Sequence, residues 1–170
     1  LFAVLLLGIL DGILLAAIAC VALLLVRVSR PHVAFLGRIP GTDSYSDLER
    51  HPDNESPRYT IIARPEASLI YVNAGSVLEA IRMKLRGSDG VRLMICDLSA
   101  SPFIDLAGSN MLKELHVELV GRGIALRIVG ARSYVRDFLR ADGLAEKVGG
   151  IDRAVTIDDL IREAGPEVRQ

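Results

Sequence analysis

The sequence predicts an α/β protein with a mixed sheet covered by helices, preceded by a transmembrane helical segment. An almost uninterrupted apolar run occupies residues 1–26. Turn-forming residues, chiefly Pro, Gly, Asp and Ser, are frequent over residues 30–57 and indicate a linker. From residue 58 onward, apolar runs of strand length alternate with segments of helical periodicity, which is typical of βαβ units. We therefore divide the chain into residues 1–29, 30–57 and 58–166.

Composition narrows the function classes. The 170 residues suffice for one modest domain and one further element. Because 20 basic residues are balanced by 21 acidic ones, the chain lacks the basic excess of a nucleic-acid-binding domain, and we expect no nucleic-acid partner. Cys20 and Cys96 each lie in an apolar run. This placement predicts buried free thiols, with no disulfide framework and no metal site.

The apolar run is long enough to cross a membrane, since a span needs about 20 apolar residues. Asp11 is its one charge, and with Gly12 it divides the run. We predict a helix end before Asp11 and a new helix over residues 12–29, with Asp11 as the N-cap. A signal peptide is disfavoured because no basic residue precedes the run. An ionisable group at membrane depth is also a functional candidate, so Asp11 keeps both interpretations.

Charge predicts the orientation of this segment. Arg27, Arg30 and Arg38 follow the apolar run closely. Positively charged flanks stay on the cytoplasmic side, so we expect an integral protein of the inner or plasma membrane with a cytoplasmic C-terminal part. The same arginines could also contact anionic lipid headgroups, and membrane lipid is an expected partner.

Residues 58–166 predict four strands and four helices. The strands are expected at residues 59–63, 68–72, 91–98 and 124–129, and the helices at residues 75–86, 105–120, 132–141 and 157–164. A short turn separates the first two strands, which we expect to pair as a hairpin. Helical crossovers join the later strands, so these should be parallel and the sheet mixed.

One loop motif resembles a known family. Asp97-Leu98-Ser99, Pro102-Phe103-Ile104-Asp105 and Gly108 follow the predicted strand 91–98. This pattern is similar to the signature loop of STAS domains. The run SRPHVAFLGRIPG at residues 29–41 resembles the juxtamembrane segment of SulP inorganic anion transporters.

The resemblance implies a STAS-like fold and a role in transport. SulP proteins move sulfate, bicarbonate or related anions through a membrane domain whose substrate site lies upstream of this chain. Their STAS domain lies in the cytoplasm and serves folding, assembly and regulation. The family resemblance also suggests a homodimer and contact with the remaining membrane domain, and it implies no cofactor.

The motif residues form the candidate site of the chain. A loop that enters a helix N-terminus presents free N–H groups and the positive end of the helix dipole. Such a loop suits an anion, a nucleotide or a regulatory protein. The candidate residues are Asp97, Ser99, Asp105, Gly108 and Ser109. In the alternative interpretation, Asp97 and Asp105 merely order a tight loop.

A second function remains open, namely a membrane-anchored STAS signalling module without transport activity. In the STAS proteins that antagonise anti-sigma factors, a phosphorylatable Ser or Thr usually precedes the glycine of this loop. Ala107 holds that position here, so the phosphate switch cannot form at it. Catalytic constellations are not evident in the sequence, and the scattered histidines, including His32 and His51, are expected to be solvated. We therefore expect no enzyme activity.

Overall fold

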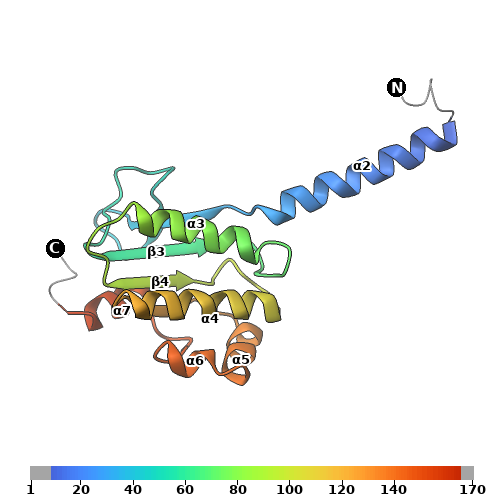
Figure 1. Ribbon diagram of the computed structural model, residues 1–170. Coiled ribbons are helices and arrows are strands. Elements are labelled where there is room, and N and C mark those ends of the chain that lie inside the picture. The colour runs from blue at the N-terminus through green and yellow to red at the C-terminus, as the bar shows by residue number, and fades with distance from the viewer. Residues whose placement is uncertain (1–8, 166–170) are drawn as a thin grey trace.

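The computed structural model describes residues 9–165 as a sheet domain from which one long helix extends (Figure 1). In chain order the described elements are α2 (Ile9–Ser29), β1 (Val33–Arg38), β2 (Tyr45–Asp47), β3 (Thr60–Pro65), α3 (Ala74–Arg86), β4 (Leu93–Asp97), α4 (Leu106–Gly121), β5 (Ala125–Val129), α5 (Ser133–Ala141), α6 (Leu144–Lys147) and α7 (Ile157–Glu163).

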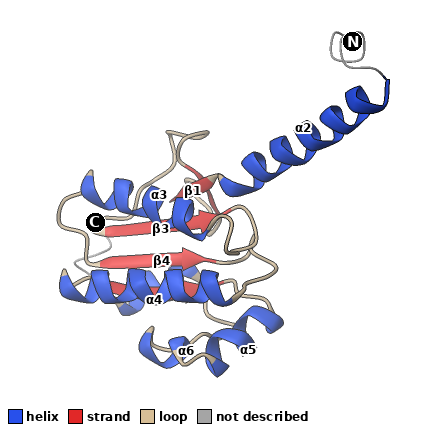
Figure 2. Ribbon diagram, turned by 45° about the vertical axis from the view of Figure 1, so that its right-hand side comes forward, coloured by secondary structure: helices blue, strands red, loops and turns tan. Residues whose placement is uncertain are grey.

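The sheet is mixed, as the sequence predicts. Its five strands lie in the order β2-β1-β3-β4-β5. The strands β3, β4 and β5 are parallel, and Ile62 lies opposite Ile95. By contrast, β1 is antiparallel to both β2 and β3. Because α3 and α4 are the crossovers between the parallel strands, both lie on the same face of the sheet (Figure 2).

The two faces of the sheet bury different amounts of apolar surface. The larger core lies between the sheet and α3 and α4, with Met94 and Cys96 of β4 fully buried against Leu112 and Leu115 of α4. On the opposite face a smaller cluster is closed by the short helix α7. Burial raises the pKa of the Cys96 thiol to about 12, so this thiol stays protonated and unreactive.

The predicted hairpin of strands 59–63 and 68–72 is wrong. The first of these segments is β3, but the second forms a turn with a single bridge, from Leu69 to Ile104. Asn73 closes this turn, because its Oδ1 accepts from the N–H of Ile70 and its Nδ2 donates to the carbonyl of Ser68. The turn leads directly into α3, which the sequence predicted.

The antiparallel part of the sheet comes instead from the expected linker. Residues 30–57 contribute β1 and β2, and Ala34 of β1 lies opposite Arg64 of β3. The apolar segment that forms β1 is short. The turn-forming residues on either side of it mark the ends of this strand. Pro40 and Gly41 lie in the connection to β2, where Gly41 has a φ of 75°. The sheet therefore begins at Val33.

Helix α2 runs through Asp11 without the predicted break. The described helix starts at Ile9, so Asp11 lies in its first turn and is not its N-cap. A carboxylate there favours the helix dipole. Residues 1–8 and 166, which belong to the expected membrane and STAS segments, lie outside the described residues.

Within residues 9–165, one helix is long and apolar enough to cross a membrane. The segment Leu10–Ser29 contains an 18-residue stretch with a mean hydropathy of 2.5, and 6% of that stretch is buried within the structure. A core helix of a soluble domain would instead be mostly buried. The near-absence of burial therefore favours the membrane interpretation.

Candidate functional site

The signature loop connects the carboxyl end of β4 to α4 and is held by the cap of that helix. Asp105 is the N-cap, and its Oδ1 accepts from the backbone N–H of Gly108 at 2.8 Å. Its Oδ2 accepts from the N–H of Tyr71 at 2.9 Å. One carboxylate therefore joins the start of α4 to the turn that precedes α3.

Gly108 is required by the close approach of this turn. A Cβ atom at Gly108 would lie 2.4 Å from the carbonyl oxygen of Leu69 and 2.9 Å from a side-chain carbon of Ile104. The obstacle is backbone, so a larger residue could be accommodated only by separating α4 from the turn. The glycine of the motif thus serves close packing.

Asp97 orders the other end of the loop. Asp97 as a whole is 7% exposed, and its Oδ1 accepts from the N–H of Ser99 at 2.9 Å. Gly130 packs against this contact, because a Cβ there would lie 2.4 Å from Oδ1 of Asp97. The hydroxyl of Ser101 donates a further hydrogen bond from this loop, to the carbonyl of Ala67 at 2.8 Å.

Ser109 belongs to a separate network behind the loop. Its buried hydroxyl donates to the carboxylate of Asp142, which also pairs with Lys113 at 2.7 Å. The Lys113 ammonium and the Ser109 hydroxyl lower the pKa of Asp142 below its ordinary value. The structure thus places Asp97, Ser99, Asp105 and Gly108 in one loop and directs Ser109 toward the end of α5.

The electrostatics of the loop disfavour an anionic ligand. Residues 97–109 contain two carboxylates and no Lys or Arg. The carboxylate of Asp105 already occupies the N-terminus of α4, where a phosphate would otherwise bind. Of the ligand classes predicted for this loop, a protein surface therefore fits better than a nucleotide.

Exposed apolar side chains surround the loop, and sequence reasoning missed them. Five apolar residues from the turns and helix starts at this end are exposed by 41–81%: Tyr71, Val72, Phe103, Leu106 and Tyr134. We call this set the apolar end. Phe103 and Tyr134 stack with ring centroids 5.3 Å apart. Phe103 lies within the motif and Leu106 directly follows its Asp105, but the exposure of both side chains depends on the tertiary fold.

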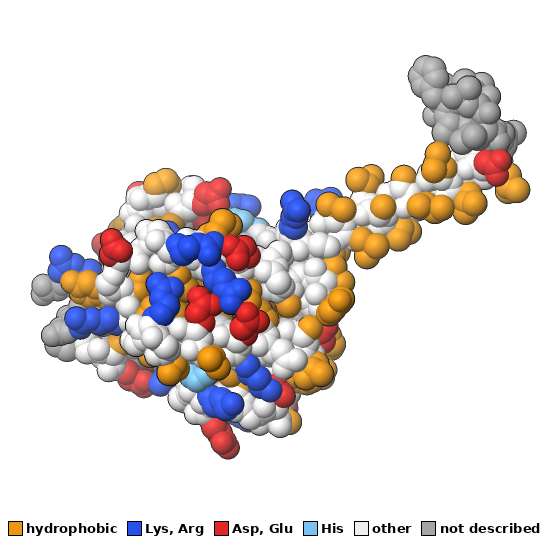
Figure 3. Space-filling view, in the orientation of Figure 1, with side chains coloured by type: hydrophobic (Ala, Val, Ile, Leu, Met, Phe, Trp, Pro, Cys, Tyr) orange, Lys and Arg blue, Asp and Glu red, His pale blue; other side chains and the backbone are white. Residues whose placement is uncertain are grey.

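The apolar end lies on the side of the domain from which α2 departs. The hydroxyl of Ser76, in the first turn of α3, donates to the carbonyl of Ser29 at the end of α2 at 2.6 Å. Figure 3 shows apolar side chains along this side of the domain, whereas charged side chains cover the face formed by α3 and α4. On that face Arg82 pairs with Glu114 and Glu118. Helix α2 and the apolar end are therefore neighbours.

Comparison with protein families and curated proteins gives a consistent result. The family model of the STAS domain matches residues 45–164. The chain is 27% identical over 165 residues to high affinity sulfate transporter 2 of Stylosanthes hamata, with 92% of this chain and 25% of that protein covered. The chain thus spans about a quarter of the length of the curated relatives it matches.

Solved structures show the same fold at low sequence identity. The murine Solute Carrier 26 family member A9 anion transporter superposes with a TM-score of 0.77 at 16% identity, covering 91% of this chain and 26% of that one. The anti-sigma factor antagonist SpoIIAA superposes with a TM-score of 0.53 at 16% identity, covering 65% of this chain and 91% of that one. The transporter match thus extends over more of this chain than the antagonist match does.

Proposed function

This chain belongs to the STAS domain family and is a STAS-containing SulP-family sequence, and from this premise we propose that it serves as the cytoplasmic C-terminal part of a membrane anion transporter. We propose sulfate as the transported anion, because the curated relatives are sulfate transporters. In this proposal α2 is the last membrane span, and the sheet domain regulates or assembles the membrane domain above it.

The observation that carries this proposal is the position of the apolar end beside α2. A membrane span that leaves the domain on one side directs that side toward the bilayer and the rest of the transporter. The exposed rings and aliphatic side chains at this end suit contact with another protein surface, where aromatic anchors are common. We propose that the apolar end contacts the cytoplasmic side of the membrane domain and so couples the domain to transport.

Three further parts of the proposal come from the sequence. Arg27 and Arg30 flank the span and favour a cytoplasmic domain. The homodimer implied by the SulP resemblance stays a prediction, and a contact between two copies could also use the apolar end. Asp11 stays a candidate for a membrane-domain function, near the far end of the described helix.

Transport is tested in cells that lack their own sulfate uptake. We expect the protein as the organism expresses it to restore uptake of radiolabelled sulfate, and unlabelled sulfate to compete. A protein that reaches the membrane in normal amount but restores no sulfate uptake contradicts the proposed substrate. If the protein restores no uptake but captures a sigma-regulating kinase in a pull-down, that result would support the alternative function of a signalling module.

Orientation is tested by cysteine labelling. In a Cys20→Ala background, Asp89→Cys places an exposed thiol between α3 and β4, while the buried Cys96 stays unreactive. A membrane-impermeant maleimide should label Asp89→Cys in inside-out vesicles and not in intact cells. Labelling in intact cells would place the domain outside the cytoplasm.

A further inference from the structure

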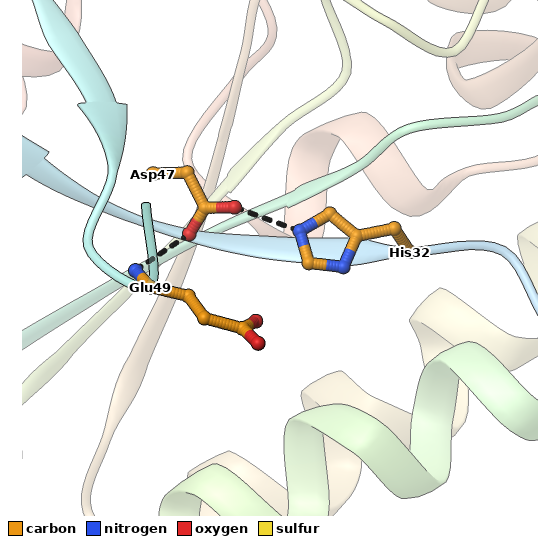
Figure 4. A group of neighbouring side chains, drawn as sticks. All are labelled: His32, Asp47 and Glu49. Carbon is orange, nitrogen blue, oxygen red and sulfur yellow. Dashed lines mark hydrogen bonds and ion pairs between the residues drawn. The ribbon is translucent and has the colours of Figure 1, made fainter. Parts of the chain in front are cut away.

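Three side chains that can ligate a metal ion meet where the connection from α2 enters the sheet (Figure 4). Nε2 of His32 lies 2.8 Å from Oδ2 of Asp47. The backbone N–H of Glu49 donates to Oδ1 of the same carboxylate at 2.9 Å. One ligating atom from each of His32, Asp47 and Glu49 lies within 4.8 Å of the others. We call this group the junction cluster.

Two members of the junction cluster are fixed by the fold. His32 directly precedes β1, and its carbonyl accepts from the N–H of Glu66 at 3.0 Å. Asp47 ends β2 and is 7% exposed. Glu49 lies in the following turn and is exposed, and its carboxylate extends toward the imidazole ring (Figure 4). A hydrogen bond therefore holds His32 and Asp47 side by side, while the exposed Glu49 can rotate to complete a coordination shell.

We propose that the junction cluster binds a divalent transition-metal ion of the zinc type. One imidazole nitrogen and two carboxylate oxygens form a mixed nitrogen and oxygen donor set, which zinc accepts at about 2.0–2.2 Å. Magnesium and calcium prefer oxygen ligands alone, so the histidine favours a transition metal over them. Water would occupy the remaining positions. The backbone N–H of Glu49 would hold the Asp47 carboxylate in place as an outer-shell partner.

The charges around the junction cluster set the strength of this site. Two carboxylates balance the charge of a divalent ion when His32 binds as the neutral imidazole. Arg50 is close enough to Asp47 to act on its carboxylate, and this cation opposes the metal. Removal of the Arg50 charge should therefore tighten metal binding, whereas a purely structural His32–Asp47 pair predicts no metal binding to tighten.

Metal binding would strengthen a connection that already exists between residues 15 positions apart, the His32–Asp47 pair. It would tie the segment after α2 to the edge strand β2, and so fix the angle at which the domain follows the membrane span. An effect on transport would rest on the function proposed above. Metal binding itself does not rest on that function, so an experiment can contradict either proposal without contradicting the other.

Titration of the whole chain in detergent micelles with zinc chloride, in a buffer that does not chelate metal, tests the site. Calorimetry should show one saturable site per chain. Glu49→Gln should weaken binding at least about tenfold, as the loss of a ligand costs no less than the loss of an outer-shell partner. Since Glu49 is exposed, this variant keeps the fold. His32→Gln should weaken binding at least as much.

Matched variants separate the junction cluster from adventitious binding. His51→Gln removes an exposed histidine four residues from Asp47 in sequence and should leave zinc affinity unchanged. Arg50→Gln should raise the affinity, and excess magnesium should not displace zinc. The proposal is overturned if the folded chain shows no saturable zinc binding, or if His51→Gln weakens binding as much as Glu49→Gln does.

Discussion

The signature loop and the junction cluster use their polar side chains in opposite ways. In the signature loop, Asp97, Ser101 and Asp105 all bind backbone groups of the loop or of the turn beside it. In the junction cluster, His32 and Asp47 bind each other, and Glu49 extends an exposed carboxylate beside them. The polar residues of the signature loop are thus used to hold the shape of that loop, while the junction cluster retains groups that can bind a ligand.

This difference shows that a recognisable motif and a binding group need not be the same residues. The polar residues of the loop order the backbone, and the apolar end that they support is left for contact with a partner. The substitutions below test that division. Substitutions in the signature loop should destabilise the fold more than a substitution near the junction cluster, and substitutions in the apolar end should lower transport at equal expression.

The largest expected effect is at Gly108. Gly108→Ala should lower the free energy of unfolding by about 3 kcal/mol, because the new methyl group meets the backbone of Leu69 and overpacking costs about 1–3 kcal/mol or more. Gly37→Ala, in β1 near the junction cluster, should cost less, because its obstacles are the side chains of Leu48 and Asn54. Pulse proteolysis in urea measures both.

Gly75→Ala is the matched control for these substitutions. It lies in the first turn of α3 with open space around it, so alanine should be neutral or stabilising by about 0.5–1 kcal/mol. Equal destabilisation by Gly108→Ala and Gly37→Ala would break the comparison between the loop and the junction.

The next effect is at the cap of α4. Asp105→Ala should cost about 2 kcal/mol, because one carboxylate accepts from two backbone N–H groups and a cap is typically worth about 1 kcal/mol. Thr156→Ala removes the cap of the short helix α7, which binds within its own helix, and should cost about 1 kcal/mol. If Thr156→Ala costs as much as Asp105→Ala, the link from α4 to Tyr71 contributes nothing.

A smaller effect should appear as a pH dependence at Asp142. The folded pKa of this carboxyl lies below its ordinary value of 3.8, chiefly because Lys113 and Ser109 bind it. Its stabilising contribution is therefore present above that value and is lost as the pH falls through the folded pKa. Asp142→Asn should destabilise the protein at pH 7 and progressively less below pH 4, as measured by urea unfolding.

Asp137→Asn serves as the control, since Asp137 is exposed and pairs with Arg140 at the surface. Surface pairs of this kind are worth at most about 1 kcal/mol, so its effect should be near zero at both pH values. A destabilisation by Asp142→Asn that does not change with pH would indicate lost packing in place of lost charge.

Local signals explain what the sequence predicted well. The buried run of β4, the cap at Asp105 and the helical spacing of α3 are each encoded within about one helix length, and the fold reproduces them. The candidate residues Asp97, Ser99, Asp105 and Gly108 also lie together, because they share one strand-to-helix loop.

Long-range pairing explains the errors. The pairing of Val33 with Pro65 and the contact of His32 with Asp47 join residues that are far apart in sequence, and no local pattern marks them. Residues 68–72 have the composition of a strand, but Asn73 closes them into a turn. Exposure of the apolar end follows from how three helix starts meet, which periodicity within any one helix cannot show.

The central claim, that the apolar end couples the domain to transport, is tested most directly by sulfate uptake. A Phe103→Ser/Leu106→Ser variant should lower uptake by about tenfold or more at equal membrane expression, the size of effect expected when anchor residues leave an interface. The control is Val117→Ser/Val120→Ser, which removes two valines at least as exposed as Phe103 and Leu106 from the opposite end of α4 and should leave uptake unchanged. Equal uptake by the two variants would contradict the claim.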